Sequence, residues 1–381
     1  MIYLDYAAAT PIDPKVLDVM MPYLTDQFFN PSASYSPAIN IRADFERTRH
    51  QIASIIGARP AEVVFTAGAT ESINLALGGV SGAIVTTAIE HPAVLNIAKG
   101  SDGKILTVDN KGRIDLDELK SAITDNVKLV SIGYANNEIG TVQPIKEISE
   151  IITQIRADRR ERNIKTPLLF HTDASAAAGL LDINVARLGV DLMTLNSGKC
   201  YGPKQVGLLY VRAGVQLQPV IIGGGQEMGL RSGTENVAGV IGFAKALEIA
   251  EKHRKSETVR LEKLRDDLQE FLVSEFLDIQ INGSQKHRLP NILNFSIPNL
   301  DGERAVFALD QSSVCVATGS ACAANKGLRS HVLTAIGLKS EIADGSLRIS
   351  LGRPTTDDEI EKLKPILRDV LHEQLKFGSV E

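Results

Sequence analysis

Cysteine is scarce in this sequence. The chain of 381 residues holds only Cys200, Cys315 and Cys322. So few thiols cannot build a disulfide framework in a chain of this length, which favours a reducing, cytoplasmic environment. The cysteines and the seven histidines are scattered, without the spacing of a zinc site, so the sequence predicts no metal centre.

Long apolar runs and an excess of positive charge are missing as well. No apolar run approaches the roughly 20 residues that a membrane-spanning helix needs, and the N-terminus has no signal-like core. The formal net charge is -5, whereas dedicated nucleic-acid-binding proteins are usually basic. We therefore expect neither a membrane nor a nucleic acid as partner. The length and the 44% apolar content are typical of a globular protein with two domains.

The order of apolar segments predicts an α/β fold. Strand-like runs that are continuously apolar alternate with helical patterns through the first two-thirds of the chain. Such runs are typical of a sheet covered on both faces, which favours a mostly parallel sheet. We expect strands at 62–66, 83–87, 127–132, 168–171, 191–195 and 207–211, and helices opening at Asp13-Pro14 and covering 38–57, 115–123, 145–160 and 235–275.

The pattern changes after the long helical segment. Strands near 278–281 and 292–297 mix with helices near 303–310 and 357–374, which predicts a smaller α+β domain. We therefore expect a large α/β domain over residues 13–247. The small domain is expected to combine residues 1–12 with residues 248–381.

A glycine turn between a strand and a helix carries Ala69 and Thr70. Free backbone N–H groups and the helix dipole favour a phosphate at such a junction. The GK[ST] ending of a Walker loop is missing. Taken alone, the segment could equally be a capped helix.

Polar side chains follow other strands, where ligands bind in open α/β sheets. His91 could stack on a flat heterocycle and move protons, or merely fill a junction. Asp173 could keep a pyridine nitrogen protonated, or cap a helix. Asn137 lies in a comparable segment. Arg348 and Arg353 could grip a carboxylate in a bidentate manner, or form ordinary ion pairs.

Lys199 and Cys322 carry the strongest chemical signals. Lys199 lies in a glycine-rich turn just past an apolar strand, where a buried amine could form a Schiff base; its neighbour Lys204 is the rival, and a solvated charge is the alternative. Cys322 lies among small residues that suit an accessible loop, which favours a reactive thiol over an inert one. Cys200 and Cys315 are interpreted as structural. An electron-sink cofactor with a thiol suggests chemistry on a sulfur-bearing amino acid.

Taken together, these segments resemble cysteine desulfurases of the NifS/IscS type, which are class V, fold-type I pyridoxal-phosphate enzymes. The resemblance runs from residues 3–8 to residues 351–353, and the segment 319–322 looks like that of the longer-loop subgroup. It implies pyridoxal 5'-phosphate as cofactor, L-cysteine as substrate, L-alanine as product and a homodimer. It also implies a sulfur-acceptor or scaffold protein, in iron–sulfur cluster assembly or another thio-cofactor or tRNA thiolation pathway.

The resemblance also implies roles for individual residues. Lys199 corresponds to the Schiff-base lysine and Cys322 to the cysteine that carries the persulfide. Arg348 corresponds to the arginine that binds the substrate carboxylate. The remaining cofactor contacts are expected from Ala69 and Thr70 at the phosphate, His91 over the ring, Asn137 near the phenol oxygen and substrate, Asp173 at the pyridine nitrogen, and Thr234 of the other subunit.

The sequence departs from the family pattern at four positions. Gly198 stands where the family has histidine, Ala176 where it has glutamine, Tyr35 where it has histidine and Met228 where it has arginine. We expect the amide of Asn196 and the hydroxyl of Ser197 to supply the lost hydrogen bonds.

Two alternatives remain open at this point. One is a selenocysteine lyase or another β-lyase of the same fold. The other is a sulfur-transfer scaffold that binds the cofactor without turnover, as the two missing side chains at positions 176 and 198 would allow.

Overall fold

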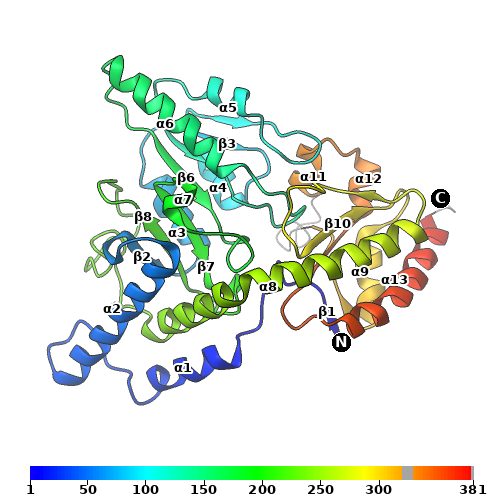
Figure 1. Ribbon diagram of the computed structural model, residues 1–381, viewed down its shortest axis with the longest axis horizontal. Coiled ribbons are helices and arrows are strands. Elements are labelled where there is room, and N and C mark those ends of the chain that lie inside the picture. The colour runs from blue at the N-terminus through cyan, green and yellow to red at the C-terminus, as the bar shows by residue number, and fades with distance from the viewer. Residues whose placement is uncertain (320–328, 379–381) are drawn as a thin grey trace.

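A seven-stranded sheet forms the centre of the protein. The computed structural model describes residues 1–319 and 329–378 (Figure 1). The strands lie in the order β2-β8-β7-β6-β5-β3-β4. Their bounds are β2 (Val63–Thr66), β3 (Ala83–Thr87), β4 (Lys104–Leu106), β5 (Val127–Ser131), β6 (Leu169–Asp173), β7 (Leu192–Asn196) and β8 (Gly207–Val211). Only β8 runs against its neighbours, β2 and β7, so the expected α/β fold with a mostly parallel sheet is confirmed.

Helices connect these strands and begin and end where local signals place them. They are α1 (Pro14–Leu24), α2 (Ser36–Ile56), α3 (Ala69–Ile73), α4 (Pro92–Ala98), α5 (Leu116–Ala122), α6 (Ile145–Glu161) and α7 (Val185–Leu188). Before α1, a carboxylate oxygen of Asp13 accepts a hydrogen bond from the Lys15 N–H at 2.9 Å. After α2, Gly57 has a φ of 72°, the left-handed conformation that glycine adopts most readily.

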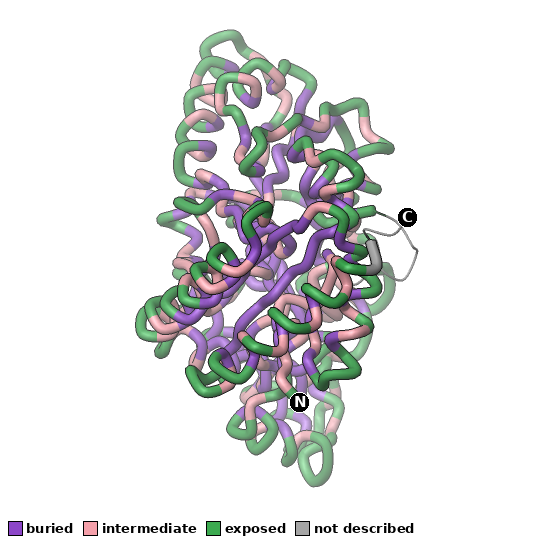
Figure 2. Tube along the Cα trace, turned by 90° about the vertical axis from the view of Figure 1, so that its right-hand side faces the viewer, coloured by how far each residue is buried: buried purple, intermediate pink, exposed green. Residues whose placement is uncertain are grey.

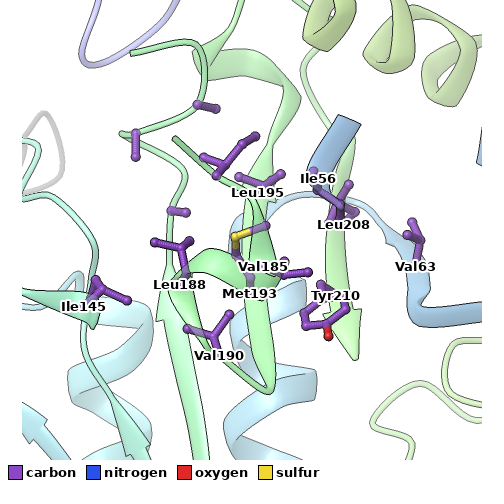
Figure 3. Close-up of a cluster of buried hydrophobic side chains, with 14 of the residues drawn as sticks. Ile56, Val63, Ile145, Val185, Leu188, Val190, Met193, Leu195, Leu208 and Tyr210 are labelled. Atoms are coloured by element: carbon purple, nitrogen blue, oxygen red, sulfur yellow. The ribbon is translucent and has the colours of Figure 1, made fainter. Parts of the chain in front are cut away.

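Both faces of the sheet are buried. Side chains alternate between the two faces along each strand, so Met193 and Leu208 join one apolar cluster while Leu192 and Leu209 join another. Figure 3 shows part of the first cluster, where β7 and β8 meet Ile56 of α2. This burial explains why the strands read as continuous apolar runs.

The long helix α8 (Val237–Glu275) links the large sheet to a second apolar core (Figure 1). Its first half contributes Phe243 to the first core, and its second half contributes Leu268 to the second. The other elements there are β1 (Ile2–Tyr3), β9 (Gln280–Ile281), β10 (Ile292–Ser296), α9 (Gly302–Gln311), β11 (Val314–Cys315), α11 (His331–Ala335), α12 (Ser340–Asp344), β12 (Ser346–Ser350) and α13 (Asp357–Gly378).

The second core contains both ends of the described chain. Strands β12, β10 and β9 form an antiparallel sheet, while β1 pairs with β11 in parallel. Leu4 packs in this core with residues from α8 and α13. The domain division into 13–247 and 1–12 with 248–381 stays a prediction that agrees with this packing.

Burial follows the two cores. Figure 2 shows buried backbone running through the centre of the molecule and exposed helices around it. Among the described residues, no helix combines the length and the apolar character needed to cross a membrane.

Candidate active site

A cavity of about 230 Å³ opens where β5, β6 and β7 end. Polar residues from the strands of both sheets line it: Asp173 ends β6 and Asn196 ends β7 in the central sheet, and Arg348 lies in β12 of the antiparallel sheet. A second cavity, of about 620 Å³, adjoins it and shares Ala8, Ala69, Thr70, Asn196 and Lys199 with it. Together they form one polar site at the carboxyl edge of the sheet.

Most of the site residues expected from the sequence meet at the first cavity. Those that line it are Ala69, Thr70, His91, Asn137, Asp173, Asn196, Lys199 and Arg348. Ser197 and Thr234 are not among the described residues that line either cavity. Cys322 lies outside the described residues.

Ser197 is fully buried although it stands two residues from Lys199. A side chain added at Gly202 would place its Cβ 2.1 Å from the Ser197 hydroxyl oxygen, so this hydroxyl faces the Gly202 turn. Asn196 does border both cavities, and the Oδ1 of its side-chain amide accepts a hydrogen bond from the Gly198 N–H at 3.1 Å. Of the two residues expected to compensate for the departures, only Asn196 therefore borders the site.

Lys199 presents its amine to the site from a short helical turn, Ser197–Lys199, directly after β7. Its Nζ donates hydrogen bonds to the Ala7 carbonyl at 2.6 Å and to the Ala8 carbonyl at 2.8 Å. The lysine thus connects the large sheet to the N-terminal segment. Its rival Lys204 borders the second cavity but, in the part of the chain that the structure describes, not the first.

His91 borders the cavity in front of α4. Its Nδ1 accepts a hydrogen bond from the Ala93 N–H at 3.1 Å, which assigns the proton of the neutral ring to Nε2. Desolvation lowers the pKa of His91; the nearby Asp173 carboxylate opposes this shift and the Lys199 amine reinforces it. The ring is therefore kept neutral near pH 7, in a form that can accept a proton.

Asp173 and Glu90 place two carboxyl groups at the cavity. Asp173 accepts a hydrogen bond from the Ser175 N–H at 2.9 Å. Glu90 is buried, with hydrogen bonds from the Thr87 hydroxyl at 2.7 Å and from the Gly133 N–H at 2.9 Å. Burial, with a further contribution from Asp173, raises the pKa of Glu90 to about 7. Glu90 was not predicted as a site residue, and its one signal in the sequence is its position directly before His91.

The raised pKa of Glu90 predicts a pH-dependent loss of stability. A carboxyl group with a higher pKa in the folded state holds its proton there, so its stabilising effect is complete below pH 4.5 and is lost as the pH rises to about 7. Glu90→Gln keeps an acceptor but cannot ionise. Between pH 4.5 and pH 8 we expect the unfolding free energy of this variant to gain roughly 3 kcal/mol relative to the unmodified protein. Urea unfolding at both pH values measures this.

Glu62→Gln is the matched control for this experiment. Glu62 is also buried, but hydrogen bonds from Arg59 and Ala213 outweigh desolvation and lower its pKa. Its carboxylate contributes stability above the unfolded pKa, and this is lost as the pH falls. Between pH 4.5 and pH 8 the unfolding free energy of Glu62→Gln should therefore fall relative to that of the unmodified protein, the opposite of the change expected for Glu90→Gln. Equal pH profiles for Glu90→Gln and the unmodified protein would contradict the assignment.

Arg348 is almost completely buried, with 1% of its surface exposed. Its Nη1 donates to the Asn137 carbonyl at 3.0 Å and its Nη2 to a carboxylate oxygen of Asp5 at 2.6 Å. Its Nε has no hydrogen-bond partner among the described residues. Arg353, by contrast, pairs with Asp13 at 3.2 Å and lies outside the first cavity.

The residues present fit pyridoxal phosphate. The cavity offers an amine at Lys199, a carboxylate at Asp173 and a guanidinium at Arg348, whose buried Nε has no hydrogen-bond partner in the described part of the chain. Beside Ala69 and Thr70, Gly68 has a φ of 137°, which glycine tolerates, and a Cβ added there would meet no atom within 4 Å. This open turn leaves room for a phosphate against backbone N–H groups.

Comparison with known proteins places the chain in a family. The family described as "Aminotransferase class-V" matches residues 2–363. "Cysteine desulfurase IscS 1" of Archaeoglobus fulgidus is 41% identical over 99% of this chain and 98% of its own length. A "NIFS-LIKE PROTEIN" of known structure superimposes with a TM-score of 0.89 at 34% identity, covering 98% of this chain and 99% of its own.

A second solved structure, the NifS-like protein from Rickettsia africae, superimposes with a TM-score of 0.88 at 32% identity, over 97% of this chain and 99% of its own. The matches span nearly the whole chain and agree with one another, so the resemblance inferred from the sequence is confirmed. The chain therefore belongs to the class-V aminotransferase family, within the group formed by the NifS/IscS-type cysteine desulfurases.

Proposed function

We propose that this protein converts L-cysteine to L-alanine with pyridoxal phosphate as cofactor and passes the sulfur through Cys322 to an acceptor protein. Relatives named cysteine desulfurases support the activity. The observation that carries the proposal is the single cavity that joins Lys199, Asp173, His91 and Arg348.

Five residues of one chain would make the main contacts with the cofactor. Lys199 would bind it covalently, and the Asp173 carboxylate would pair with its ring nitrogen. The turn at Ala69 and Thr70 would take the phosphate, and His91 would lie against the ring. When bound, pyridoxal phosphate supplies an electron sink for charge that develops on the substrate.

The chain's own groups then handle substrate and protons. The Arg348 guanidinium lies at the cavity next to Asn137 and would bind the substrate carboxylate. The Lys199 amine, once it leaves the Ala7 and Ala8 carbonyls, can move protons at the substrate's α-carbon. Neutral His91 can accept a proton from the substrate amine or thiol.

Cys322 is proposed as the nucleophile toward sulfur. Its thiolate would attack the substrate sulfur, so that an S–S bond forms while the bond between sulfur and Cβ breaks. The electron pair of the broken bond stays with carbon, and a proton then completes L-alanine. Cys322 is left as a persulfide, which an acceptor thiol or scaffold protein can discharge.

One assay separates this proposal from its alternatives. Purified holoenzyme is given L-cysteine or L-selenocysteine, and L-alanine is measured together with the mass of the peptide that contains Cys322. L-Alanine from L-cysteine with a persulfide on that peptide supports the proposal. Turnover of L-selenocysteine alone would favour a selenocysteine lyase, and no turnover of either would favour a scaffold.

We also propose that the protein is a homodimer. Large apolar side chains are exposed on α1, on the segment between α1 and α2, on the first turn of α2, and at residues 220–228. They are Leu17, Met21, Leu24, Phe28, Tyr35, Ile39, Val220, Ile221, Ile222 and Met228. Tyr35 and Met228, two departures from the family pattern, belong to this set. Such exposure is typical of a surface that meets another protein.

Thr234 tests the dimer directly. It is exposed and does not border its own chain's cavity within the described residues, as expected of a residue that serves the partner's phosphate. Thr234→Ala and Lys199→Ala variants should each be impaired. A mixture that has exchanged subunits should regain activity, because each hybrid dimer contains one site with both residues intact.

The control for this mixing experiment keeps the two substitutions in one chain. The double variant mixed with itself should regain nothing. A fully active monomer in analytical ultracentrifugation would contradict the dimer.

A further inference from the structure

The N-terminal segment is held firmly at the edge of the cavity. Strand β1 pairs with β11, and Asp5 then forms a bridge with Ser350 of β12. The Tyr3 hydroxyl lies 2.9 Å from the carbonyl oxygens of both Asp5 and Ala9, which share its single donated proton. These contacts fix the backbone turn that carries Asp5.

Asp5 meets the guanidinium that the proposed function assigns to the substrate carboxylate. The Nη2 of Arg348 lies 2.6 Å from the Asp5 carboxylate, and the side chain of Asp5 is itself 19% exposed. The backbone of Arg348 is pinned as well, because its N–H donates to the Ala317 carbonyl and its own carbonyl accepts from the Ala317 N–H. Without the ion pair to Asp5, the guanidinium end of the Arg348 side chain would be the part of the residue free to change its orientation.

The two Nη anchors leave one guanidinium nitrogen, Nε, without a hydrogen bond among the described residues. Asn137 takes Nη1 and Asp5 takes Nη2. A guanidinium presents its donors in a rigid plane, so fixing both Nη atoms also fixes the direction of the Nε–H. An unpaired buried donor is costly unless a ligand satisfies it.

We propose that Asp5 is a positioning residue that holds the Arg348 guanidinium, which lines the cavity, in the orientation that binds the carboxylate of the amino-acid substrate. This inference rests on the proposed role of Arg348. Asp5 also supplies the counter-charge that a buried guanidinium requires before substrate arrives. Without Asp5 only the Asn137 carbonyl orients the side chain, and the fit to a carboxylate is lost.

An opposite effect competes with this one. The negative charge of Asp5 repels a substrate carboxylate bound to the same guanidinium. If repulsion dominated, removing the charge would strengthen binding. The sign of the change in affinity therefore decides whether Asp5 positions Arg348 or merely competes for it.

The experiment compares two small ligands of the holoenzyme, L-alanine and ethylamine, which share the amine but differ in the carboxylate. In Asp5→Ala we expect the dissociation constant of L-alanine and the KM for L-cysteine to rise about tenfold or more, the scale of one hydrogen bond to a charged group. The affinity for ethylamine and kcat should change little. Asp5→Asn, which keeps the acceptor oxygen, should restore most of the affinity for L-alanine.

Two further variants make the result decisive. Tyr3→Phe leaves the ion pair between Asp5 and Arg348 intact but loosens the turn that carries Asp5. It should therefore weaken L-alanine binding, by less than Asp5→Ala does. This variant still tests the proposal if Asp5→Ala does not fold. Asp13→Ala is the matched control, because Asp13 also pairs with an arginine, Arg353, and its side chain is 18% exposed. Removal of the Asp13 carboxylate should lower the thermal stability of the protein without changing its affinity for L-alanine.

The outcomes separate this inference from the function on which it rests. Unchanged or tighter L-alanine binding in Asp5→Ala, with weaker binding in Arg348→Ala, would overturn the role of Asp5 alone. Unchanged L-alanine binding in Arg348→Ala as well would overturn the assignment of Arg348. Equal losses for L-alanine and ethylamine would show a general structural defect and would also overturn positioning.

Discussion

Lys199→Ala is expected to abolish covalent attachment of the cofactor and to lower turnover of L-cysteine by about a thousandfold or more, the scale of a lost nucleophile and proton-transfer group. The reason is geometric, since Lys199 is the lysine that borders the first cavity together with Asp173 and His91. Borohydride reduction followed by peptide mapping should find the label on Lys199 in the unmodified protein and none in the variant. Some cofactor should still bind non-covalently.

Lys204→Ala provides the control for this experiment. Lys204 lies in the same glycine-rich segment but borders only the second cavity among the described residues. Covalent attachment should persist in this variant. A label found on Lys204 in the unmodified protein would contradict the assignment of Lys199.

Cys322→Ser should remove L-alanine formation from L-cysteine almost completely while the visible absorption of the bound cofactor stays the same. The thiol is proposed to attack the substrate sulfur, and a hydroxyl at neutral pH is a far weaker nucleophile than a thiolate. Turnover with L-cysteine and mass spectrometry of the Cys322 peptide measure both consequences.

The other cysteines are the controls. Cys200 is buried, its thiol donates to the Ser197 carbonyl at 3.4 Å, and burial raises its pKa to about 12. It therefore stays protonated and inert, and Cys200→Ser should keep turnover within a small factor. Cys315→Ser should do the same, because Cys315 lies in β11. A persulfide on Cys200 would refute the role of Cys322.

The sequence predicted the part of the site that depends on strand ends. Lys199, Asp173 and Asn196 follow apolar runs, and the carboxyl ends of parallel strands meet at one edge of a sheet, so their convergence follows from topology. The three-residue strand β4 escaped detection because so short a segment carries no usable periodicity.

Contacts made by tertiary packing could not be predicted in this way. Asp5 and Arg348 are 343 residues apart, and nothing local to either one indicates the other. Glu90 has an ionisable side chain that is buried and hydrogen-bonded to Thr87 and Gly133, which neighbouring strands bring to it. Ser197 shows why proximity along the chain does not by itself place a side chain at the site, since its buried hydroxyl faces the Gly202 turn two residues from Lys199.

The pairing of the N-terminal segment with β11 and β12 has a consequence for synthesis on the ribosome. Every strand of the central sheet has been translated once residue 211 is made, so the cofactor side of the cavity can assemble early. The Asp5 carboxylate must wait for Arg348, near the end of translation. A nascent chain would thus acquire its sheet well before its complete carboxylate site, which delays amino-acid binding until the chain is nearly finished.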